Sequence, residues 1–441
     1  MNAGNYAGDL GADEESGEDE EQSSEEAKTE ARVAPNYGKI AKAIADAQLS
    51  GVNIELPDIN EAQVDFVPDI ARNSILYSLQ AVNVVGVDLL DRILKNRPYA
   101  SVEDFIDKVA PTQVQMIGLI KAGCFDRMCG VPRTQILYKY LRRLAEEAFP
   151  LRDKLTTVQV RKALELGLEF PDYKNEIRLF RFKQYISKNR LDKNSKRYIF
   201  AADDDACIKF FNMFVAPHMN LSKSEYEFLP NGSIAVKQTA FERTYTKLTD
   251  QLMEYVNSPA GRKAYQELLQ NDFIRSMQEK YCNGSLSSWE FETMCFYHSG
   301  HELAGMNESV YDTRNFESLP EIPANKKLCT IAGTVTDCNN TKHIVSVLTK
   351  YGIVDVKFYA SAYAQFNQKI SVVDPETKKK TVVDDSWFKR GNKILVFGQR
   401  RENMFCARSD RSSGFAPRMV GLIGGVRPDG SLDIRYARTK K

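Results

Sequence analysis

Residues 344–359 read Ile344-Val-Ser-Val-Leu-Thr-Lys-Tyr-Gly-Ile-Val-Asp-Val-Lys-Phe-Tyr359. Apolar and polar side chains alternate on both sides of Tyr351-Gly352, which is the pattern of two antiparallel strands joined by a tight turn. Because successive side chains of a strand point to opposite faces, Lys357 and Tyr359 are expected on the outer face, with their valine and phenylalanine neighbours inside. The hairpin therefore predicts a β domain with one buried face.

More strands of the same kind surround this hairpin. Their short length and close spacing predict a small barrel built from five or six strands. An OB-fold is the natural candidate, although an SH3-like barrel would give similar spacing. The further strands are expected at Cys329–Thr336, Lys393–Gly398, Met404–Arg408 and Met419–Ile423.

The sequence before the barrel has a helical period. A helix is predicted over residues 37–49, and Gly86 lies in a turn just before another short amphipathic helix. Ser101 can cap a third helix through Lys108, and Thr112 with Gln115 forms a capping-box signature for a fourth. This spacing favours a helix-hairpin-helix arrangement, whose amides can hold a phosphate. A two-helix packing unit without a ligand is the alternative.

Residues 132–300 are predicted to be mostly helical. Part of this region is strongly basic and is interleaved with Phe180, Phe182 and Tyr185. Cations that neutralise phosphates and rings that stack on bases together favour a nucleic-acid surface. The alternative is a set of core aromatics flanked by solvated cations. The basic residues are Arg178, Arg181, Lys183, Lys188, Arg190, Lys193, Lys196 and Arg197.

The composition is that of a globular protein: 441 residues, 43% hydrophobic and 27% charged. It excludes wholly disordered and collagen-like chains. The sequence contains neither an apolar run long enough for a membrane helix nor a basic and apolar leader at Met1, so no membrane partner and a cytoplasmic location are expected. Eight cysteines without a CxxC pair indicate reduced thiols and no zinc site.

The net charge of +1 conceals an asymmetry. Residues 1–32 hold eleven acidic and two basic side chains, a net charge of −9, so the rest of the chain carries +10. Such an acidic segment, with almost no apolar residues, is expected to be disordered. It is either a solubilising tail or linker, or a tail that occupies a basic groove and is displaced by nucleic acid.

These patterns predict an α+β protein of five parts. A disordered acidic tail is followed by a helix-hairpin-helix region, a helical domain, a linker and an OB-like barrel with its own tail. The expected boundaries are 1–35, 36–130, 131–306, 307–325 and 326–441.

Four stretches in this order resemble the C-terminal half of the alpha subunit of bacterial DNA polymerase III, a C-family replicative polymerase. Lys39 to Asn60 looks like the end of that family's fingers region, and Ile75 to Asp126 looks like its tandem helix-hairpin-helix. Trp289 to His301 is similar to a signature before its OB domain, and Ile331 to Gly391 looks like that domain itself.

The sequence departs from this family at two places. The first hairpin usually carries two glycines after a lysine, whereas here Asn83, Val84 and Gly86 occupy those positions, so this hairpin lacks one closely approaching amide and one cation for a phosphate. Family members also carry a sliding-clamp peptide near the middle region. The nearest candidates, which make a sliding clamp a possible partner, are Gln251-Leu-Met-Glu-Tyr255 and Gln270-Asn-Asp-Phe-Ile274.

The resemblance implies that this chain does not catalyse alone. Two-metal phosphoryl transfer needs paired aspartates, and in this family they belong to a palm that precedes everything matched here. We interpret Asp203 to Asp205 as an acidic helix cap. His298 and His301 are expected three residues apart on one helix face, and we interpret them as packing residues. We therefore expect no catalytic residue, metal ligand or cofactor on this chain, and magnesium on a palm-bearing partner.

Three hypotheses remain open at this stage. The chain is the DNA-gripping part of a split phage or bacterial replicative polymerase, with the palm on another chain; or a free-standing, non-catalytic DNA-binding accessory; or a decayed gene product. Duplex and single-stranded DNA are the expected ligands of the first two. Besides the basic residues named above, the expected DNA-binding residues are Gly86, Lys95, Arg97 and Lys121 near the hairpins, and Lys357, Tyr359, Lys389 and Arg390 on the barrel.

Overall fold

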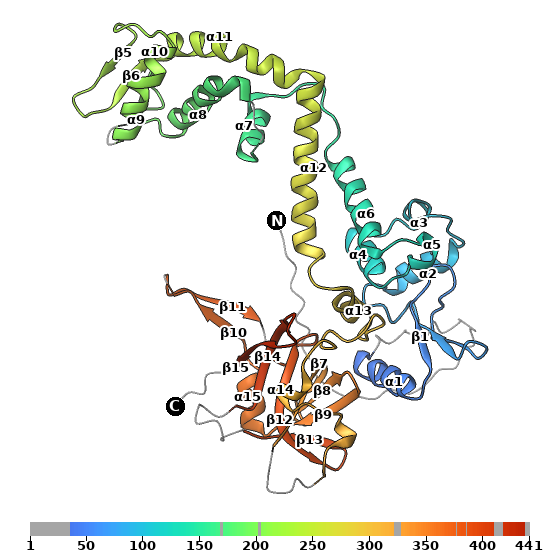
Figure 1. The fold of residues 1–441 in the computed structure, drawn as a ribbon. Helices are drawn as coiled ribbons and strands as arrows, with labels where there is room; N and C mark the ends of the chain where they lie inside the picture. The colour runs from blue at the N-terminus through green and yellow to red at the C-terminus, as the bar shows by residue number, and fades with distance from the viewer. Residues whose placement is uncertain are drawn as a thin grey trace, which may run out of the picture. The chain divides into compact units, whose positions relative to one another are not determined.

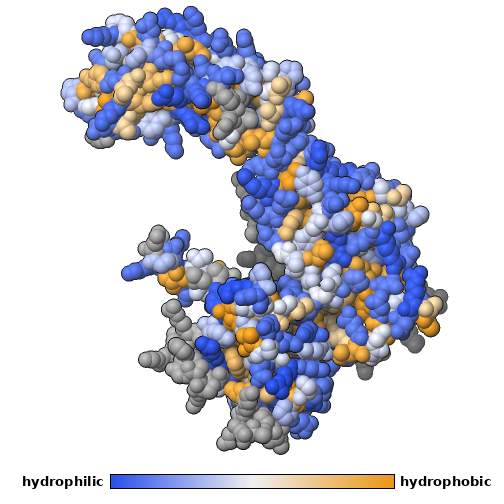
Figure 2. Space-filling model, in the orientation of Figure 1, coloured by the Kyte–Doolittle hydropathy of each residue, from blue (hydrophilic) through white to orange (hydrophobic). Residues whose placement is uncertain are grey.

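The computed structural model describes residues 36–167, 171–201, 204–321, 328–375, 377–384, 386–409 and 418–436 (Figure 1). It confirms a mixed α and β protein that ends in a barrel. The predicted acidic tail lies outside the described residues. None of the described helices is both long and apolar enough to cross a membrane, and hydrophilic residues dominate the face drawn in Figure 2.

The first part of the chain is a cluster of short helices with a three-stranded sheet of order β1-β3-β2. These elements share one apolar core, which also includes Trp289 and Phe296 from much later in the chain. The elements are α1 (Tyr37–Leu49), β1 (Asn53–Glu55), β2 (Val67–Asp69), β3 (Ser74–Leu76), α2 (Val87–Lys95), α3 (Val102–Val109), α4 (Gln113–Lys121), α5 (Asp126–Cys129) and α6 (Arg133–Ala148).

Two predicted helix starts in this cluster are confirmed. The Ser101 hydroxyl accepts a hydrogen bond from the Asp104 N–H at 3.1 Å. Thr112 and Gln115 form the reciprocal capping box, in which each side chain accepts a bond from the other residue's backbone N–H. Both bonds satisfy donors that a helix otherwise leaves unpaired, so the local sequence is sufficient to place these ends.

The middle part is largely helical, as predicted, but it also contains a sheet of order β4-β6-β5. The sequence pattern hid this sheet because its strands are three or four residues long, and Ile234 to Val236 are all buried and do not alternate. The elements are α7 (Thr157–Glu165), η1 (Pro171–Tyr173), α8 (Lys174–Lys188), β4 (Arg197–Phe200), α9 (Asp205–Phe210), the π-helix η2 (Phe211–Val215), α10 (Ala216–His218), β5 (Tyr226–Phe228), β6 (Ile234–Lys237), α11 (Gln238–Asn257), α12 (Pro259–Tyr281) and α13 (Leu286–Met294).

The last part contains most of the strands. The elements are α14 (Glu308–Tyr311), η3 (Phe316–Ser318), β7 (Cys329–Asn339), β8 (Ile344–Thr349), β9 (Gly352–Lys357), α15 (Ala360–Phe366), β10 (Ile370–Val373), β11 (Lys380–Asp384), β12 (Lys393–Arg401), β13 (Met404–Ala407), β14 (Val420–Val426) and β15 (Leu432–Tyr436). The hairpin of β10 and β11 projects from the barrel (Figure 1).

The pairing of these strands gives an OB-type barrel. β7, β8 and β9 pair antiparallel in sequence order, β13 pairs parallel to β9, and β12 pairs with both β13 and β7 to close the ring. One helix, α15, lies in the connection between the third and fourth barrel strands. Val356 and Phe358 are buried inside, as predicted. This closed Greek-key order favours the OB-fold over the SH3-like alternative.

The segment after α13 ties the first helices to the barrel. The Tyr77 hydroxyl donates a hydrogen bond to the Met294 carbonyl at 2.7 Å. A ring nitrogen of His298 lies 3.1 Å from the Ile54 carbonyl, and one of His301 lies 2.9 Å from the Leu348 carbonyl of β8. The expectation of two histidines on one helix face was wrong, because α13 ends at Met294 and both residues follow in a loop.

A buried ion pair reinforces this junction. Arg133 at the start of α6 and Glu290 of α13 have side chains that are 5% and 0% exposed, and a guanidinium nitrogen lies 2.9 Å from a carboxylate oxygen. Arg133 also bonds Asp126 at 2.7 Å, while Glu290 accepts bonds from Ser299 and from the His298 N–H. The network satisfies two buried charges that would otherwise strongly destabilise the fold.

Candidate nucleic-acid interface

The outer face of β9 and β13 carries a cation and aromatic cluster, which we call the barrel face: Lys357, Tyr359, Arg408 and Lys342. Cys406 lies beside Lys357 in the parallel register, so the residues two positions on, Tyr359 and Arg408, also come together. The Arg408 guanidinium lies 4.5 Å from the centre of the Tyr359 ring, and Tyr359 is 54% exposed. The Lys357 ammonium donates to the carbonyl of Lys342 in the β7–β8 loop.

This geometry agrees with the outward orientation predicted for Lys357 and Tyr359. Sequence reasoning missed Arg408 and Lys342, although Arg408 lay at the end of a predicted strand. An exposed ring backed by a guanidinium can stack on a base, and neighbouring cations can neutralise phosphates.

The other two predicted barrel residues lie near the start of α1. The Arg390 guanidinium lies 4.6 Å from the centre of the Tyr37 ring, and Lys389 is exposed. Tyr37 and Arg390 line a depression of about 490 Å³ together with Asp337. Burial raises the pKa of the Tyr37 hydroxyl, as does Cys295, while Arg390 opposes this rise. The carboxylate of Asp337 makes this depression less suited to phosphate than the barrel face.

The first hairpin presents the N-terminus of α2. Gly86 is the N-cap and offers no side chain to the helix amides, and a Cβ at this position would meet no atom within 4 Å. The Asn83 N–H is already used, because it donates to the Thr293 carbonyl at 2.9 Å. Val84 packs against Gly118 of α4, where a Cβ would come within 2.5 Å of the valine methyl groups. One side of the hairpin is therefore packed into the protein.

Of the predicted cations near the hairpins, Lys95 is the one at the surface. It is exposed, and within the described ranges it forms no hydrogen bond or ion pair. Arg97 donates to the carbonyls of Ile59 and Ala62, at 2.8 Å and 2.5 Å, and burial lowers its pKa. Lys121 is 5% exposed and lies 2.7 Å from Glu292. Arg97 and Lys121 thus support the fold, which leaves two features for the phosphates of a backbone: the amides at the N-terminus of α2, and Lys95 at its other end, about 12 Å away.

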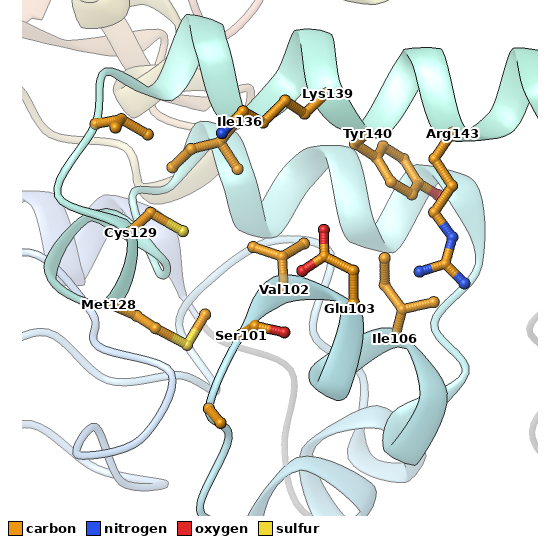
Figure 3. A pocket seen from close by; sticks show the side chains of 12 residues that line it. Ser101, Val102, Glu103, Ile106, Met128, Cys129, Ile136, Lys139, Tyr140 and Arg143 are labelled. Carbon is orange, nitrogen blue, oxygen red and sulfur yellow. The ribbon is translucent and has the colours of Figure 1, made fainter.

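A cavity of about 210 Å³ lies beside these helices, between α3, α5 and α6 (Figure 3). Apolar side chains such as Ile106 and Met128 line much of it. Its charged groups have mixed signs: Glu103 stands opposite Lys139, and Arg143 pairs with Asp107 and Glu147. A mixed and mostly apolar lining does not suit a phosphate group.

The basic run from Arg178 to Arg197 divides into two sets. Three members are engaged: Lys183 pairs with Glu242, Arg190 donates to backbone carbonyls including that of Arg197 at 3.0 Å, and Arg197 pairs with Glu227. Five are exposed, and in the part of the chain that the structure describes they form no ion pair: Arg178, Arg181, Lys188, Lys193 and Lys196. The interleaved Phe180 and Phe182 belong to the core, so the predicted alternative holds for those two rings.

Two other sequence motifs have structural roles. The Asp204 carboxylate caps α9 by accepting from the Cys207 N–H at 2.9 Å, as predicted for this acidic cluster, while Asp203 lies outside the described residues. The sliding-clamp candidates lie within α11 and α12, where Leu252 and Ile274 are buried. Neither candidate is therefore an extended, accessible peptide.

No group of three histidine, cysteine or carboxylate side chains is placed to hold a metal ion among the residues that the structure describes. His301 is largely buried, and this burial lowers its pKa, although its bond to the Leu348 carbonyl opposes the shift.

The chain is similar in sequence to a helix-hairpin-helix family model and to several DNA polymerases. A family model described as a helix-hairpin-helix motif matches residues 51–136. The chain is 31% identical over 426 residues to the probable DNA polymerase YorL of Bacillus subtilis and to the DNA-directed DNA polymerase of Bacillus phage SPbeta. It is 34% identical over 113 residues to the DNA polymerase III subunit alpha of Chlamydia trachomatis.

The resemblance to the DNA polymerase III alpha subunit is confirmed. The alignments with the two Bacillus polymerases cover 92% of this chain and 31% of each relative, and the alignment with the Chlamydia alpha subunit covers 24% of this chain and 9% of that protein. The chain thus spans about a third of the length of these two Bacillus polymerases. The 8% of this chain that is not aligned is much shorter than the middle part. Most of the middle part is therefore shared with the two Bacillus polymerases.

Proposed function

We propose that this chain is the DNA-binding part of a DNA polymerase III alpha-like replicative polymerase, and that a separate chain carries the catalytic palm. The observation that carries the proposal is the similarity to two DNA polymerases along 92% of the chain, over 31% of their length. The phage SPbeta relative supports a role in phage replication. In this arrangement the palm chain would hold the magnesium ions on its own aspartates.

In this proposal, two surfaces bind different forms of DNA. The barrel face would hold single-stranded template, since OB-folds bind strands through exposed rings and cations on this side of the barrel. The helix-hairpin-helix would hold the duplex backbone through Lys95 and the amides of α2, because backbone amides and cations contact phosphates without reading sequence. A polymerase needs affinity of this kind, which is independent of base sequence.

The direct test is reconstitution. The chain is affinity-purified from its native source, and the proteins that co-purify are identified by mass spectrometry. We expect a stoichiometric partner with palm aspartates, and primer extension with magnesium by the two chains together but by neither alone. Recovery of DNA without such a partner would contradict the split arrangement and favour the accessory hypothesis, and primer extension by this chain alone would overturn the proposal.

Lys95 provides a test of the hairpin surface. Lys95→Glu should weaken duplex binding several-fold at low salt and reduce the dependence of log K on log salt by about one unit, because one phosphate contact is lost. Lys247→Glu on α11 is the matched control, since Lys247 is also exposed and, within the described part of the chain, without an ion pair. An unchanged salt dependence in Lys95→Glu would remove the hairpin from the interface. Arg97 is unsuitable for this test because its guanidinium holds two backbone carbonyls.

A further inference from the structure

The middle part contains a ladder of neighbouring aromatic rings to which the proposed function assigns no role. The rings of Phe210 and Phe214 lie 5.2 Å apart, and the imidazole of His218 stacks on Phe214 at 5.1 Å with planes 12° apart. The Arg178 guanidinium of α8 lies 3.9 Å from the centre of the Phe214 ring. All four side chains lie at least partly at the surface.

A π-helix lies in the middle of this ladder. Residues Phe211–Val215 form η2 between α9 and α10. Phe210, Phe214 and His218 follow one another at intervals of four residues, which places them on the same side of the helical segment. Such turns are rare and occur often at functional sites. Met213, in the middle of this turn, is 82% exposed.

A groove of about 410 Å³ lies next to the ladder. Arg178, Arg181 and Tyr185 line it from α8, and Cys207 and Phe210 line it from α9. Among the described residues, Asp204 is the one carboxylate in the lining, and it already accepts bonds from the Tyr185 hydroxyl at 2.5 Å and the Cys207 N–H. The groove therefore combines apolar walls with two guanidinium groups and an acid that is already hydrogen-bonded.

Further cations continue along the same helix. Lys174, Arg178, Arg181 and Lys188 of α8 are all exposed and, within the described ranges, form no ion pair. Intervals of four, three and seven residues keep them on one face of the helix. A row of cations beside an apolar groove can bind both the phosphates and the bases of a single strand. The cations neutralise the phosphates, and the apolar walls offer flat surfaces on which unpaired bases can stack.

We infer that this groove is a second site for single-stranded nucleic acid, in which a base stacks on Arg178 and the backbone follows α8. The Arg178 guanidinium lies 3.9 Å from the centre of the Phe214 ring and 5.2 Å from that of Phe210, and the side chain is exposed on its remaining side, so a base can stack on it there. A duplex would use the cations but leave the groove empty, because its bases are already stacked. The inference rests on the proposed DNA-binding function but on different residues from the barrel face.

The decisive variant, Arg178→Lys, keeps the positive charge of residue 178 and removes the planar guanidinium group. Arg178→Lys should lower the affinity of the full chain for oligothymidine at least about fivefold and leave duplex affinity unchanged, because stacking on one base contributes that much binding. The measurement is made in the Tyr359→Ala/Arg408→Ala background, so that the barrel face contributes little. Equal single-strand affinity with and without the Arg178→Lys substitution would overturn the inference.

A second pair of variants tests the row of cations. Arg181→Glu/Lys188→Glu should weaken oligothymidine binding about tenfold in the same background, whereas Lys223→Glu/Lys247→Glu, which changes the net charge equally, should change it less than about twofold. Equal losses in both pairs would show a general charge effect and contradict a site on α8.

Photo-crosslinking locates the strand directly. Oligothymidine containing 5-iodouracil should crosslink to Tyr185, Phe210 or Phe214, and the peptides are identified by mass spectrometry. Crosslinks that map only to the barrel would contradict the second site while supporting the proposed function. A wild-type chain that binds neither single-stranded nor duplex DNA would instead contradict the proposed function itself.

Discussion

Glu290→Ala should lower the free energy of unfolding of the helix-hairpin-helix region by about 3–5 kcal/mol, the largest effect on stability that we expect from one substitution. The change removes one of the two carboxylates that neutralise the buried guanidinium of Arg133 and leaves only its pair with Asp126. It also removes the acceptor for the N–H groups of His298 and Ser299 and for the Ser299 hydroxyl. A buried charge would then be less well compensated and three donors would lose their acceptor, and this costs far more than the packing of a small side chain.

The measurement is urea denaturation followed by Trp289 fluorescence in a Trp387→Phe background, since Trp289 packs in the core of this region. Arg142→Ala is the control, because its pair with Glu146 is exposed and should contribute less than about 0.5 kcal/mol. Glu290→Gln should fall between the two, as it keeps an acceptor but loses the charge. A loss below about 1 kcal/mol for Glu290→Ala would show that the network is relaxed in solution.

Tyr359→Ala/Arg408→Ala should reduce the affinity of the full chain for single-stranded DNA by about tenfold to a hundredfold, the largest effect on binding that we expect from the barrel. The double variant removes an exposed stacking ring and the cation held against it. Loss of one stacked base costs about 1–3 kcal/mol, and loss of one cation reduces the dependence on salt. Fluorescence anisotropy with labelled oligothymidine at several salt concentrations measures both effects.

The control is Tyr138→Ala on α6, a tyrosine that is 46% exposed and lies outside the proposed interface. It should retain wild-type affinity. A double barrel variant that binds like the wild type would leave the barrel without a role in holding the template, and the search for the strand would move to the groove beside α8.

Local patterns predicted much of the fold, because those features depend on neighbours in the chain. The capping box of Thr112 and Gln115 needs only residues three apart, and the strands of the barrel alternate with a period that the backbone imposes. The sheet of β4, β6 and β5 escaped this reasoning, since its strands are short and β6 is buried without alternation. The histidine pair was misplaced for a related reason: the left-handed turn at Cys295, with φ 61°, ends α13 where the apolar pattern continues.

The candidate site was less predictable than the fold. Sequence reasoning grouped Arg97 and Lys121 with Lys95 because all three are cations near the hairpins, yet the first two are held by carbonyls or by a carboxylate distant in sequence. Likewise, the eight basic residues from Arg178 to Arg197 look equivalent in a list, whereas three are already engaged in the fold. Whether a cation is available to a phosphate depends on its partners, and those come from other parts of the chain.

The sequence by itself determined the order of the elements, the alternation that turns Tyr359 outward and the relation to DNA polymerases, because each depends on local periodicity or on residues aligned in order. Only the tertiary structure decided that Arg408 meets Tyr359, that Glu290 neutralises Arg133 and that Arg178 stacks on Phe214. These pairs are separated by 36 to 157 residues. Contacts over such separations form only when strands close into a barrel or helices pack together, so the chemistry of the surface follows from the fold.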